Sequence, residues 1–524
     1  MLLEASMTPH TEHLPGTMES SAKGSSWPLD DWQRVDRFLV FGAEDGTYYA
    51  GERERELVIA NASAAQRCLA ADGLQFVSRI VDASETGRAP KNDPAIFLLA
   101  MAAKLGDEPT RRAAYAALPR VCRIGTHLMH FAHHAQGFGG WGRGMRKAVG
   151  AWFNARPATE LAYQLAKYQA HDGWSNRDLL RLSHPRAASP SHDRLFAWAV
   201  KGALPEGAGE DPALALIVAI RELQTIEDTA TAADLIRKNR VPRECVPTPL
   251  LRHAEIWEAL LEAMPLGAML RNLATMTRVK LIAVGSAATK KIADELRSAD
   301  RIAKARVHPL AILSALVTYR SGRGKGDGAW IPVLDIVDAL DAAFYLSFGS
   351  VMPANKRMLL ALDISGSMGS GSVGGVVGMT PRIGSAAMAL VTAATEPSTT
   401  ILGFTTDLTR LDVAGKRLDR VVSETGGLGF GGTDCAQPML WAMANKIEVD
   451  TFVVYTDSET WAGNVHPAQA LEQYREAHGI PSKLIVVGMT SNGFTLANPD
   501  DAGMLDVVGF DTSTPLVLSD FARA

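Results

Sequence analysis

The spacing of apolar residues changes near residue 350 and divides the chain into two parts. From about residue 27 to residue 348, apolar residues recur at helical spacing, and Gly, Pro, Asn and Asp separate the successive segments. This pattern predicts an all-α region in which antiparallel helix pairs stack as a curved solenoid. The helical segments that we expect begin at residue 57 and cover 93–99, 119–135, 160–170, 178–182, 212–223 and 249–264.

Apolar runs of strand length appear after residue 356. Helical stretches at 382–396, 435–447 and 467–478 separate these runs, which cover 357–362, 399–404, 452–456 and 483–488. Short apolar runs that alternate with helices are typical of buried parallel strands, so we expect an α/β doubly wound sheet here.

The two patterns define the domains that we expect. Residues 1–26 are polar and contain no apolar run, which predicts a disordered N-terminal tail. Residues 27–350 then form the helical domain and residues 351–524 the α/β domain, with the boundary near 349–355. Within the α/β domain, the long Gly-rich segment 366–378 is expected to be mobile.

The composition is that of a soluble globular protein, with 47% hydrophobic and 21% charged residues. No apolar stretch reaches the roughly 18 residues of a membrane span, and the polar N-terminus lacks the apolar core of a signal peptide. The four cysteines are scattered without a CxxC pair, which argues against a zinc site or a disulfide framework and fits a reducing compartment. We therefore expect a cytoplasmic protein with no membrane partner.

Charge is distributed unevenly along the chain. Residues 351–524 carry 11 Lys and Arg against 18 Asp and Glu, whereas residues 1–350 carry 42 basic against 39 acidic residues. Within 109–186, 12 basic residues and six histidines face only three acidic residues. This local excess of positive charge predicts a surface that binds a polyanion.

Polar side chains follow two of the predicted strands and a loop between them. Asp363, Ser365 and Ser367 follow one strand, Asp457 follows another, and Thr433 lies in the Gly-Gly-Thr-Asp segment between the two. Ligands of open α/β sheets bind at the carboxyl ends of strands. Two carboxylates and three hydroxyls form a hard oxygen set suited to Mg²⁺ or another divalent cation. The alternative is a strand-end turn that caps the next helix, with Asp457 an unrelated acid.

This arrangement resembles the metal-ion-dependent adhesion site of von Willebrand factor A domains, and all five positions match the motif of that family. The resemblance implies that Ser365, Ser367 and Thr433 contact the metal directly or through water. It also implies that Asp363 and Asp457 hold metal-bound waters.

The helical part resembles the TROVE module of the Ro ribonucleoprotein autoantigen family. The resemblance rests on blocks at 141–149, 167–168, 173–185, 257–261, 264–265, 270–273, 307–309 and 318–322. Together with the A domain, it implies a closed ring of HEAT-like helical pairs whose two ends the A domain joins. It further implies that small noncoding Y RNAs bind the outer face and that single-stranded 3′ ends of misfolded RNAs enter the central hole.

Candidate RNA-binding residues lie in the basic blocks that carry this resemblance. Arg and Lys neutralise phosphates, and His and Arg planes stack on unpaired bases. The candidates are Arg143, Arg146, Lys147, Lys167, His171, Arg177, Arg181 and His184. Animal members have an Arg followed by Asn where this chain has His171 and Asp172, which indicates a bacterial type of protein and RNA partner.

Several of these features have structural alternatives. His184 could cap a helix end, and Lys167 could lie on a solvated helix face. The histidines at 127, 130, 133 and 134 could form a metal-binding face, but no nearby carboxylate or Cys completes a site, which favours packing or proximity to RNA. The Gly-rich segment 137–144 is expected to be a turn between helices, and His308 is expected to be structural.

These observations favour a non-enzymatic, monomeric RNA-binding scaffold in RNA quality control. Its expected partners are a small Y-like RNA, single-stranded 3′ ends and an exoribonuclease such as polynucleotide phosphorylase. The alternative is an adaptor that binds protein ligands through a Mg²⁺-dependent A-domain site. A metal-dependent RNA hydrolase is disfavoured, because two-metal chemistry needs several carboxylates around two ions about 4 Å apart.

Overall fold

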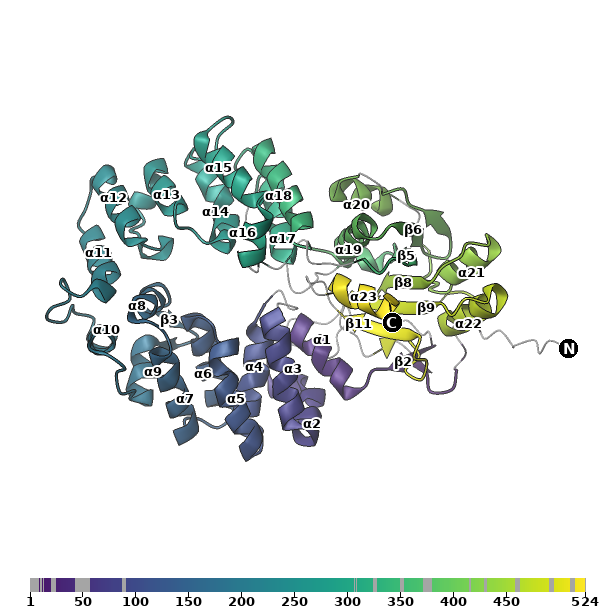
Figure 1. Ribbon diagram of the computed structural model, residues 1–524, viewed down its shortest axis with the longest axis horizontal. Coiled ribbons are helices and arrows are strands. Elements are labelled where there is room, and N and C mark those ends of the chain that lie inside the picture. The colour runs from purple at the N-terminus through teal and green to yellow at the C-terminus, as the bar shows by residue number, and fades with distance from the viewer. Residues whose placement is uncertain are drawn as a thin grey trace.

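Figure 1 shows the computed structural model, an arc of helices whose two ends meet an α/β domain. The structure describes residues 9, 12, 14–19, 25–42, 57–86, 91–305, 307, 309–323, 328–348, 353–370, 379–413, 416–427, 431–457, 462–489, 494–508 and 514–523. His308, most of the Gly-rich segment 366–378 and part of the predicted boundary at 349–355 lie outside these residues.

The arc runs from α1 through α11 and α12 at its far side to α17 and α18 (Figure 1). Its helices are α1 (Asp31–Phe41), α2 (Ser63–Ala71), α3 (Gly73–Thr86), α4 (Asp93–Leu105), α5 (Glu108–Val121), α6 (Gly125–Gly137), α7 (Arg143–Asn154), α8 (Ala158–Lys167), α9 (Asn176–Ser183), α10 (Pro190–Lys201), α11 (Ala215–Leu223), α12 (Thr229–Asn239), α13 (Ala254–Leu261), α14 (Leu266–Arg278), α15 (Ala287–Leu296), α16 (Ala299–Ala305), α17 (Pro309–Ser321) and α18 (Leu334–Leu346). The predicted all-α region of helical pairs is confirmed.

Local sequence explains where many of these helices begin. The carboxylate of Asp30 accepts a hydrogen bond from the Gln33 N–H while the Gln33 side chain accepts one from Asp30, a capping box that starts α1. Ser175 and Asp178 form the same arrangement at α9. Asp107 caps α5, and Pro109 in its first turn needs no hydrogen-bond partner for a backbone N–H.

The predicted helical segment 160–170 ends at Lys167, with Ala170 in a short strand, and two other predicted segments are interrupted by a turn. The segment 119–135 is broken between α5 and α6, where Cys122–Ile124 leave the helical conformation and Gln164 accepts a hydrogen bond from the Gly125 N–H. The segment 249–264 is broken at His253, so that Leu250–Arg252 form a 3₁₀ turn before α13 begins. Apolar residues next to both breaks, such as Cys122 and Leu250, are buried, so the apolar spacing continues and does not reveal the breaks.

The α/β domain contains a mostly parallel sheet with strands in the order β11-β9-β8-β5-β6-β7. Its strands are β5 (Arg357–Asp363), β6 (Ser398–Phe404), β7 (Leu408–Arg410), β8 (Thr451–Thr456), β9 (Lys483–Gly488) and β11 (Met504–Val508), and only β7 pairs antiparallel. All four predicted strands are confirmed, whereas β7 and β11 were not predicted.

Helices cover both faces of this sheet. Alternate residues of β5, such as Leu359 and Ala361, pack in one core with α21 (Gln437–Ala444) and α22 (Pro467–His478). Leu360 and Leu362 point the other way and pack with α19 (Pro381–Thr395), α20 (Leu418–Gly426) and α23 (Thr514–Arg523). The doubly wound architecture is therefore confirmed, and the core on the second face is continuous with that of the helical arc.

The first seam between arc and α/β domain is formed by residues 25–28 and α1 against β10 (Phe494–Thr495) and β11. Strand β2 (Ser25–Pro28) pairs antiparallel with β10 on one side and with β1 (Met18–Glu19) on the other. Next to this small sheet, Arg37 of α1 makes two hydrogen bonds of 2.8 and 3.1 Å to the carboxylate of Asp506 in β11. Both side chains of this pair are buried, at 1% and 5% exposure.

This seam corrects the prediction that residues 1–26 form a disordered tail. Ser26 is fully buried, and β1 and β2 are ordered strands. The prediction was wrong for these residues because the four-residue strand pairs with a partner about 466 residues away, which composition does not reveal.

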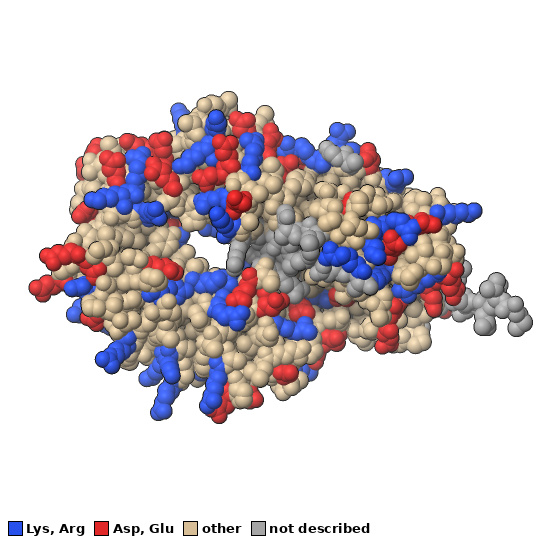
Figure 2. Space-filling view, in the orientation of Figure 1, with Lys and Arg blue, Asp and Glu red and all other residues tan. Residues whose placement is uncertain are grey.

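The second seam is formed by α17 and α18 against α20. Arg320 of α17 is hydrogen-bonded to Asp419, and Arg417 donates to Asp338 of α18 at 2.6 Å. These side chains are largely solvent-exposed. With both seams closed the chain forms a ring, and Figure 2 shows an opening through its centre with Lys and Arg side chains along part of the rim.

Among the residues that the structure describes, no helix is both long enough and apolar enough to span a bilayer. The four cysteines are buried and unpaired with one another.

Candidate metal and RNA-binding sites

The two carboxylates of the predicted oxygen site follow neighbouring strands. β5 ends at Asp363, and β8 ends at Thr456, immediately before Asp457. The strands are parallel and paired, with Leu362 opposite Tyr455, so their carboxyl ends coincide at one edge of the sheet. Both carboxylates are buried, at 0% and 1% exposure.

Hydrogen bonds hold the first part of the motif in place. The carboxylate of Asp363 accepts from the Ser365 N–H at 2.9 Å and from the Thr456 hydroxyl at 2.8 Å. The hydroxyls of Ser365 and Ser367 lie 3.0 Å apart. Burial, and then the neighbouring carboxylate of Asp457, raise the pKa of Asp363. A divalent cation would relieve both causes, because it replaces lost hydration and neutralises the paired charge.

The loop that carries Thr433 crosses the same sheet edge. The Asp434 N–H donates to the carbonyl of Thr405, which follows β6, and the Ala462 N–H donates to the carbonyl of Thr433. These two bonds tie the loop to the chain segments that follow β6 and β8, and β5 lies between those strands. Thr433 is buried there, so the three separated pieces of the motif converge as predicted.

Arg382, in the first turn of α19, supports this site and was not predicted. Its guanidinium donates to the carbonyls of Ile364 at 3.2 Å and Ser365 at 3.0 Å, and so fixes the backbone of the Asp363–Ser367 turn. The donor set itself consists of carboxylate and hydroxyl oxygens, which fits a hard cation such as Mg²⁺. The only sequence signal for Arg382 was its place at the start of a helix after a Gly-rich loop.

The predicted basic residues lie on two helices that pack side by side. Trp141, just before α7, packs against Trp174, just before α9, with ring centroids 5.4 Å apart. At the other end, a Cβ on Gly150 of α7 would lie 3.3 Å from Pro185, and Asn154 donates to the carbonyl of Arg186. The N-terminal ends of α7 and α9 therefore contact each other, and so do their C-terminal ends. The two helices run parallel, and α8 connects them in the chain.

Five of the eight candidates form one exposed basic surface on these helices, which we call the α7–α9 surface. Its members are Arg143, Arg146, Lys147, Arg177 and Arg181, all exposed. None of them is paired with a carboxylate among the described residues. Spacings of three and four residues place the basic residues of each helix on one side of it. Figure 2 shows Lys and Arg side chains that project from the outer rim where α9, α7 and α5 lie.

Comparison with known proteins identifies both halves of the chain. Residues 18–321 match the model of the TROVE domain, and residues 357–522 match the model of the Ro60 vWA domain. The chain belongs to the Ro60 family.

Two relatives extend the match over nearly the whole chain. The RNA-binding protein RO60 of Deinococcus radiodurans is 41% identical over 98% of this chain and 97% of its own length. The RNA-binding protein RO60 of Caenorhabditis elegans is 32% identical over 97% of this chain and 90% of its own length. The crystal structure of the Deinococcus radiodurans Ro (Rsr) protein superimposes with a TM-score of 0.74, at 41% identity, over 94% of this chain and 99% of that one.

The remaining candidates of this Ro60-family chain lie in different environments. Lys167 is not on a solvated helix face, because its side chain is only 9% exposed and its Nζ lies 3.1 Å from the Tyr163 hydroxyl and 3.8 Å from Glu244. Burial opposes its charge, but the Tyr163 and Glu244 contacts outweigh burial and raise the pKa of Lys167. Because Lys167 is paired within the protein, it is a structural residue beside the α7–α9 surface and is less available to contact RNA.

His184 and His171 are both exposed. His184 ends α9 in the left-handed conformation, with φ of 45°, and its N–H donates to the Leu180 carbonyl. It therefore fulfils the predicted capping alternative while its imidazole stays accessible. His171 contacts the carboxylate of Asp172 at 2.9 Å, which the sequence did not indicate.

The histidine series on α6 serves different purposes along the helix. His134 packs edge-on against Phe97 at 5.1 Å, and burial lowers the pKa of His134 to about 4. Burial likewise lowers the pKa of His127 to about 4. Packing is thus confirmed for these two residues.

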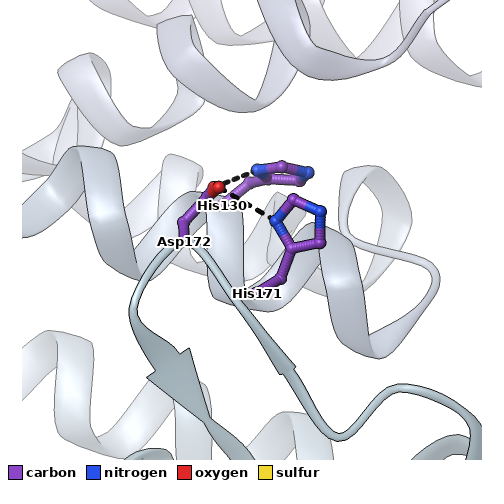
Figure 3. A group of neighbouring side chains, drawn as sticks. All are labelled: His130, His171 and Asp172. Atoms are coloured by element: carbon purple, nitrogen blue, oxygen red, sulfur yellow. Dashed lines mark hydrogen bonds and ion pairs between the residues drawn. The ribbon is translucent and has the colours of Figure 1, made fainter.

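The prediction that no carboxylate lies near the histidine series was wrong, because the chain folds Asp172 against His130 (Figure 3). The segment 137–144 connects α6 to α7, as predicted.

Proposed function

We propose that this chain is a non-enzymatic RNA-binding ring. The observation that carries the proposal is the α7–α9 surface, where five exposed basic side chains have no carboxylate partner among the described residues. Unpaired cations that are fixed on a rigid pair of helices bind phosphates and release counterions without first breaking protein ion pairs. The names of the two curated relatives, both called RNA-binding proteins, support this function.

The α7–α9 surface suits a small structured RNA of the Y-like kind. Arg side chains from two parallel helices present forked donors to phosphates along one RNA strand. His184, exposed at the end of α9, adds a plane that can stack on an unpaired base. RNA recognition of this type depends on backbone shape with a few contacts to unpaired bases.

The central opening suits a different form of RNA. Figure 2 shows it framed partly by Lys and Arg side chains, which attract phosphates. We propose that single-stranded 3′ ends of misfolded RNAs enter there, and that an exoribonuclease such as polynucleotide phosphorylase processes them as a partner. The outer surface and the opening would then handle the structured and the unpaired parts of RNA in one particle.

The oxygen site at Asp363 and Asp457 completes the proposal with a Mg²⁺ ion. When bound, the ion would supply positive charge and an open coordination position for a partner's oxygen. Asp363, Ser365, Ser367, Thr433 and Asp457 would hold it, and Arg382 would keep the turn in position. Among the described residues this donor set has two carboxylates, fewer than two-metal chemistry uses, which favours a binding role over RNA hydrolysis.

The main experiment compares one triple variant and one double control variant with the parent protein by gel shift. Replacing Arg143, Arg146 and Lys147 by Ala should weaken binding of a Y-like RNA about 10–100-fold, equivalent to about 1.4–2.8 kcal/mol. It should also reduce the salt dependence by about one unit of slope per lost phosphate contact. The control replaces Lys290 and Lys291, exposed on α15, and should leave affinity unchanged. Equal affinities for all three proteins would refute the assignment of the α7–α9 surface.

A second experiment tests the central opening. A structured RNA with a free 3′ tail should bind more tightly than a blunt version of the same RNA, and neither should be shortened by the protein alone. Equal binding of the two RNAs would argue against entry of a single strand. RNA degradation that disappears in Asp363→Ala would instead support the enzyme hypothesis.

An adaptor that binds a protein carboxylate at the A-domain site remains the second candidate, and the buried oxygen set favours it. Asp363→Ala should abolish Mg²⁺ binding by calorimetry and the gain in melting temperature that Mg²⁺ gives. RNA affinity should stay within about threefold, less than 1 kcal/mol. Retention of Mg²⁺ binding in this variant would exclude Asp363 and its neighbours as the Mg²⁺ site. Loss of RNA binding would show that RNA binding by the helical arc depends on the A domain.

A further inference from the structure

A tight hairpin presents an acidic side chain at its tip beside α6. Strands β3 (Ala170–His171) and β4 (Trp174–Ser175) pair antiparallel, with His171 opposite Trp174. The two residues that connect them, Asp172 and Gly173, both have positive φ, at 50° and 76°. These values define the two-residue hairpin turn for which Asp-Gly is a preferred sequence. The position of the Asp172 carboxylate is therefore set by the backbone.

Two imidazoles converge on this carboxylate from different elements. Nδ1 of His130, on α6, is hydrogen-bonded to one oxygen of Asp172, and Nδ1 of His171 lies 2.9 Å from the other (Figure 3). The two rings are 4.5 Å apart between centroids. One potential ligand atom from each of the three residues can be chosen so that all lie within 4.8 Å of one another.

A second carboxylate lies behind one of the imidazoles. Asp93, the first residue of α4, has an oxygen 3.9 Å from Nε2 of His130, the ring nitrogen that faces away from Asp172. Metal-binding histidines commonly direct their other nitrogen toward a carboxylate, which selects the tautomer and makes the ligand more basic. His130 thus lies between two acids, with Asp93 at ion-pair distance, longer than a hydrogen bond.

We propose that His130, His171 and Asp172 bind a divalent transition-metal ion, with Zn²⁺ as the best fit. Two imidazole nitrogens and one carboxylate oxygen form a borderline donor set that suits Zn²⁺ better than Mg²⁺. Bonds of about 2.0–2.1 Å in tetrahedral geometry separate ligand atoms by roughly 3.3 Å. The Nδ1 atom of His171 and its Asp172 oxygen, 2.9 Å apart, would separate by about 0.4 Å to admit the ion, and the shorter contact between His130 and Asp172 would lengthen further.

The site has an accessible side and no competing thiolate. His171 is 48% exposed, so a fourth coordination position would face solvent and could hold water. The four cysteines are buried, and burial raises the pKa of three of them well above the ordinary thiol value, so they would not capture the ion at neutral pH. The scattered cysteines therefore exclude a thiolate zinc site but say nothing about one built from imidazoles.

Metal binding would fasten the hairpin tip to α6. The hairpin leads directly into α9, which carries Arg177 and Arg181 of the α7–α9 surface. A bound ion would therefore fix the start of α9 and remove His171 from the residues free to contact RNA. This assignment replaces a direct RNA role for His171 with a positioning role, and it stands whether or not the proposed RNA function is correct.

The test is a Zn²⁺ titration of the full-length chain by calorimetry, with Mg²⁺ in excess. Asp363→Ala serves as the parent protein, so that the A-domain site does not contribute. We expect one equivalent of Zn²⁺ to bind the parent. Asp172→Asn should show no binding at Zn²⁺ concentrations that saturate the parent. Asn also suits the hairpin turn, so this variant should fold. His133→Ala, an exposed histidine on the same helix, should bind like the parent.

A finer variant examines the supporting carboxylate. Asp93→Asn should weaken Zn²⁺ binding about 10–100-fold without abolishing it, as is typical when the outer partner of a ligating histidine is lost. Failure of the parent to bind Zn²⁺, or binding that persists in Asp172→Asn, would overturn the proposal. Either result would show that the cluster is a hydrogen-bonded contact in which both imidazoles donate to one carboxylate. RNA affinity, measured separately, reports on the proposed function alone.

Discussion

The two ends of the helical arc meet the A domain in different ways. At the first seam, a short strand joins a sheet and a buried Arg37–Asp506 pair makes two hydrogen bonds. At the second seam, Arg320 and Arg417 pair with acids at the surface, where water competes for every charge. Buried and exposed ion pairs differ in kind, because a buried charge that loses its partner cannot be rehydrated. The ion pair of the first seam is therefore strong, and those of the second seam are weak.

The largest effect is expected from breaking the buried pair. Arg37→Met should destabilise the protein by about 3–5 kcal/mol in denaturant unfolding, because Asp506 stays buried without a counter-charge. Thr495, which donates to Asp506 at 2.6 Å, cannot neutralise it. The double variant Arg37→Met with Asp506→Leu should recover much of the loss. A single variant within about 1 kcal/mol of the parent protein would contradict the strong character of this ion pair.

A somewhat smaller effect is expected from the strand of the first seam. Trp27 is buried, and its ring meets that of His466 edge-on at 5.0 Å. Trp27→Ala should cost about 3 kcal/mol in melting or denaturant experiments, the lower end of the range for buried aromatic residues. Met18→Ala, on the exposed neighbouring strand, is the control and should change stability by less than about 0.5 kcal/mol.

The second seam should respond weakly and only at low salt. Arg320→Ala or Arg417→Ala should each cost no more than about 1 kcal/mol, because both ion pairs are exposed. Near 1 M NaCl the cost should disappear, since screening then acts within about 3 Å. Parallel unfolding curves at low and high salt give the comparison. A salt-independent loss of several kcal/mol would mean that the ion pairs of the two seams are alike.

The smallest effect is expected from acid, which should remove the stabilisation that the Arg320–Asp419 ion pair provides. Burial opposes the charge of Asp419, but its bond to Arg320 outweighs burial and lowers the pKa of Asp419. A depressed carboxyl pKa stabilises the fold above the unfolded value, near 3.9, and this contribution is lost as pH falls through the folded value. The difference between Arg320→Ala and the parent, measured by thermal melting, should therefore be present at pH 6 and fade below about pH 4. A difference that grew on acidification would contradict the sign of this shift.

The sequence predicted well those features whose signals are local. Asp363, Ser365 and Ser367 follow an apolar run directly, so parallel strand pairing alone brings them to Asp457. The basic residues of α7 and α9 likewise lie at helical spacing on exposed faces. In such cases the secondary structure already determines the geometry of the site.

Other features depend on contacts that no local pattern records. Lys167 has the sequence context of a surface lysine, but Glu244 and two tyrosines enclose it in the folded chain. Asp172 lies 42 positions from His130, and only the hairpin turn brings them together. Long-range pairs of this kind depend on how the helices stack, which periodicity cannot specify.

Strand pairing at the first seam also implies a delay during synthesis, because the two paired strands lie far apart in the chain. β2 leaves the ribosome about 466 residues ahead of β10. At about 5–20 residues per second, β2 would wait roughly 25–90 s for its partner. During this interval its backbone donors and acceptors are open to any strand edge. Its length of four residues, the two serines that begin it and the proline that ends it limit stable pairing with a wrong edge before β10 emerges.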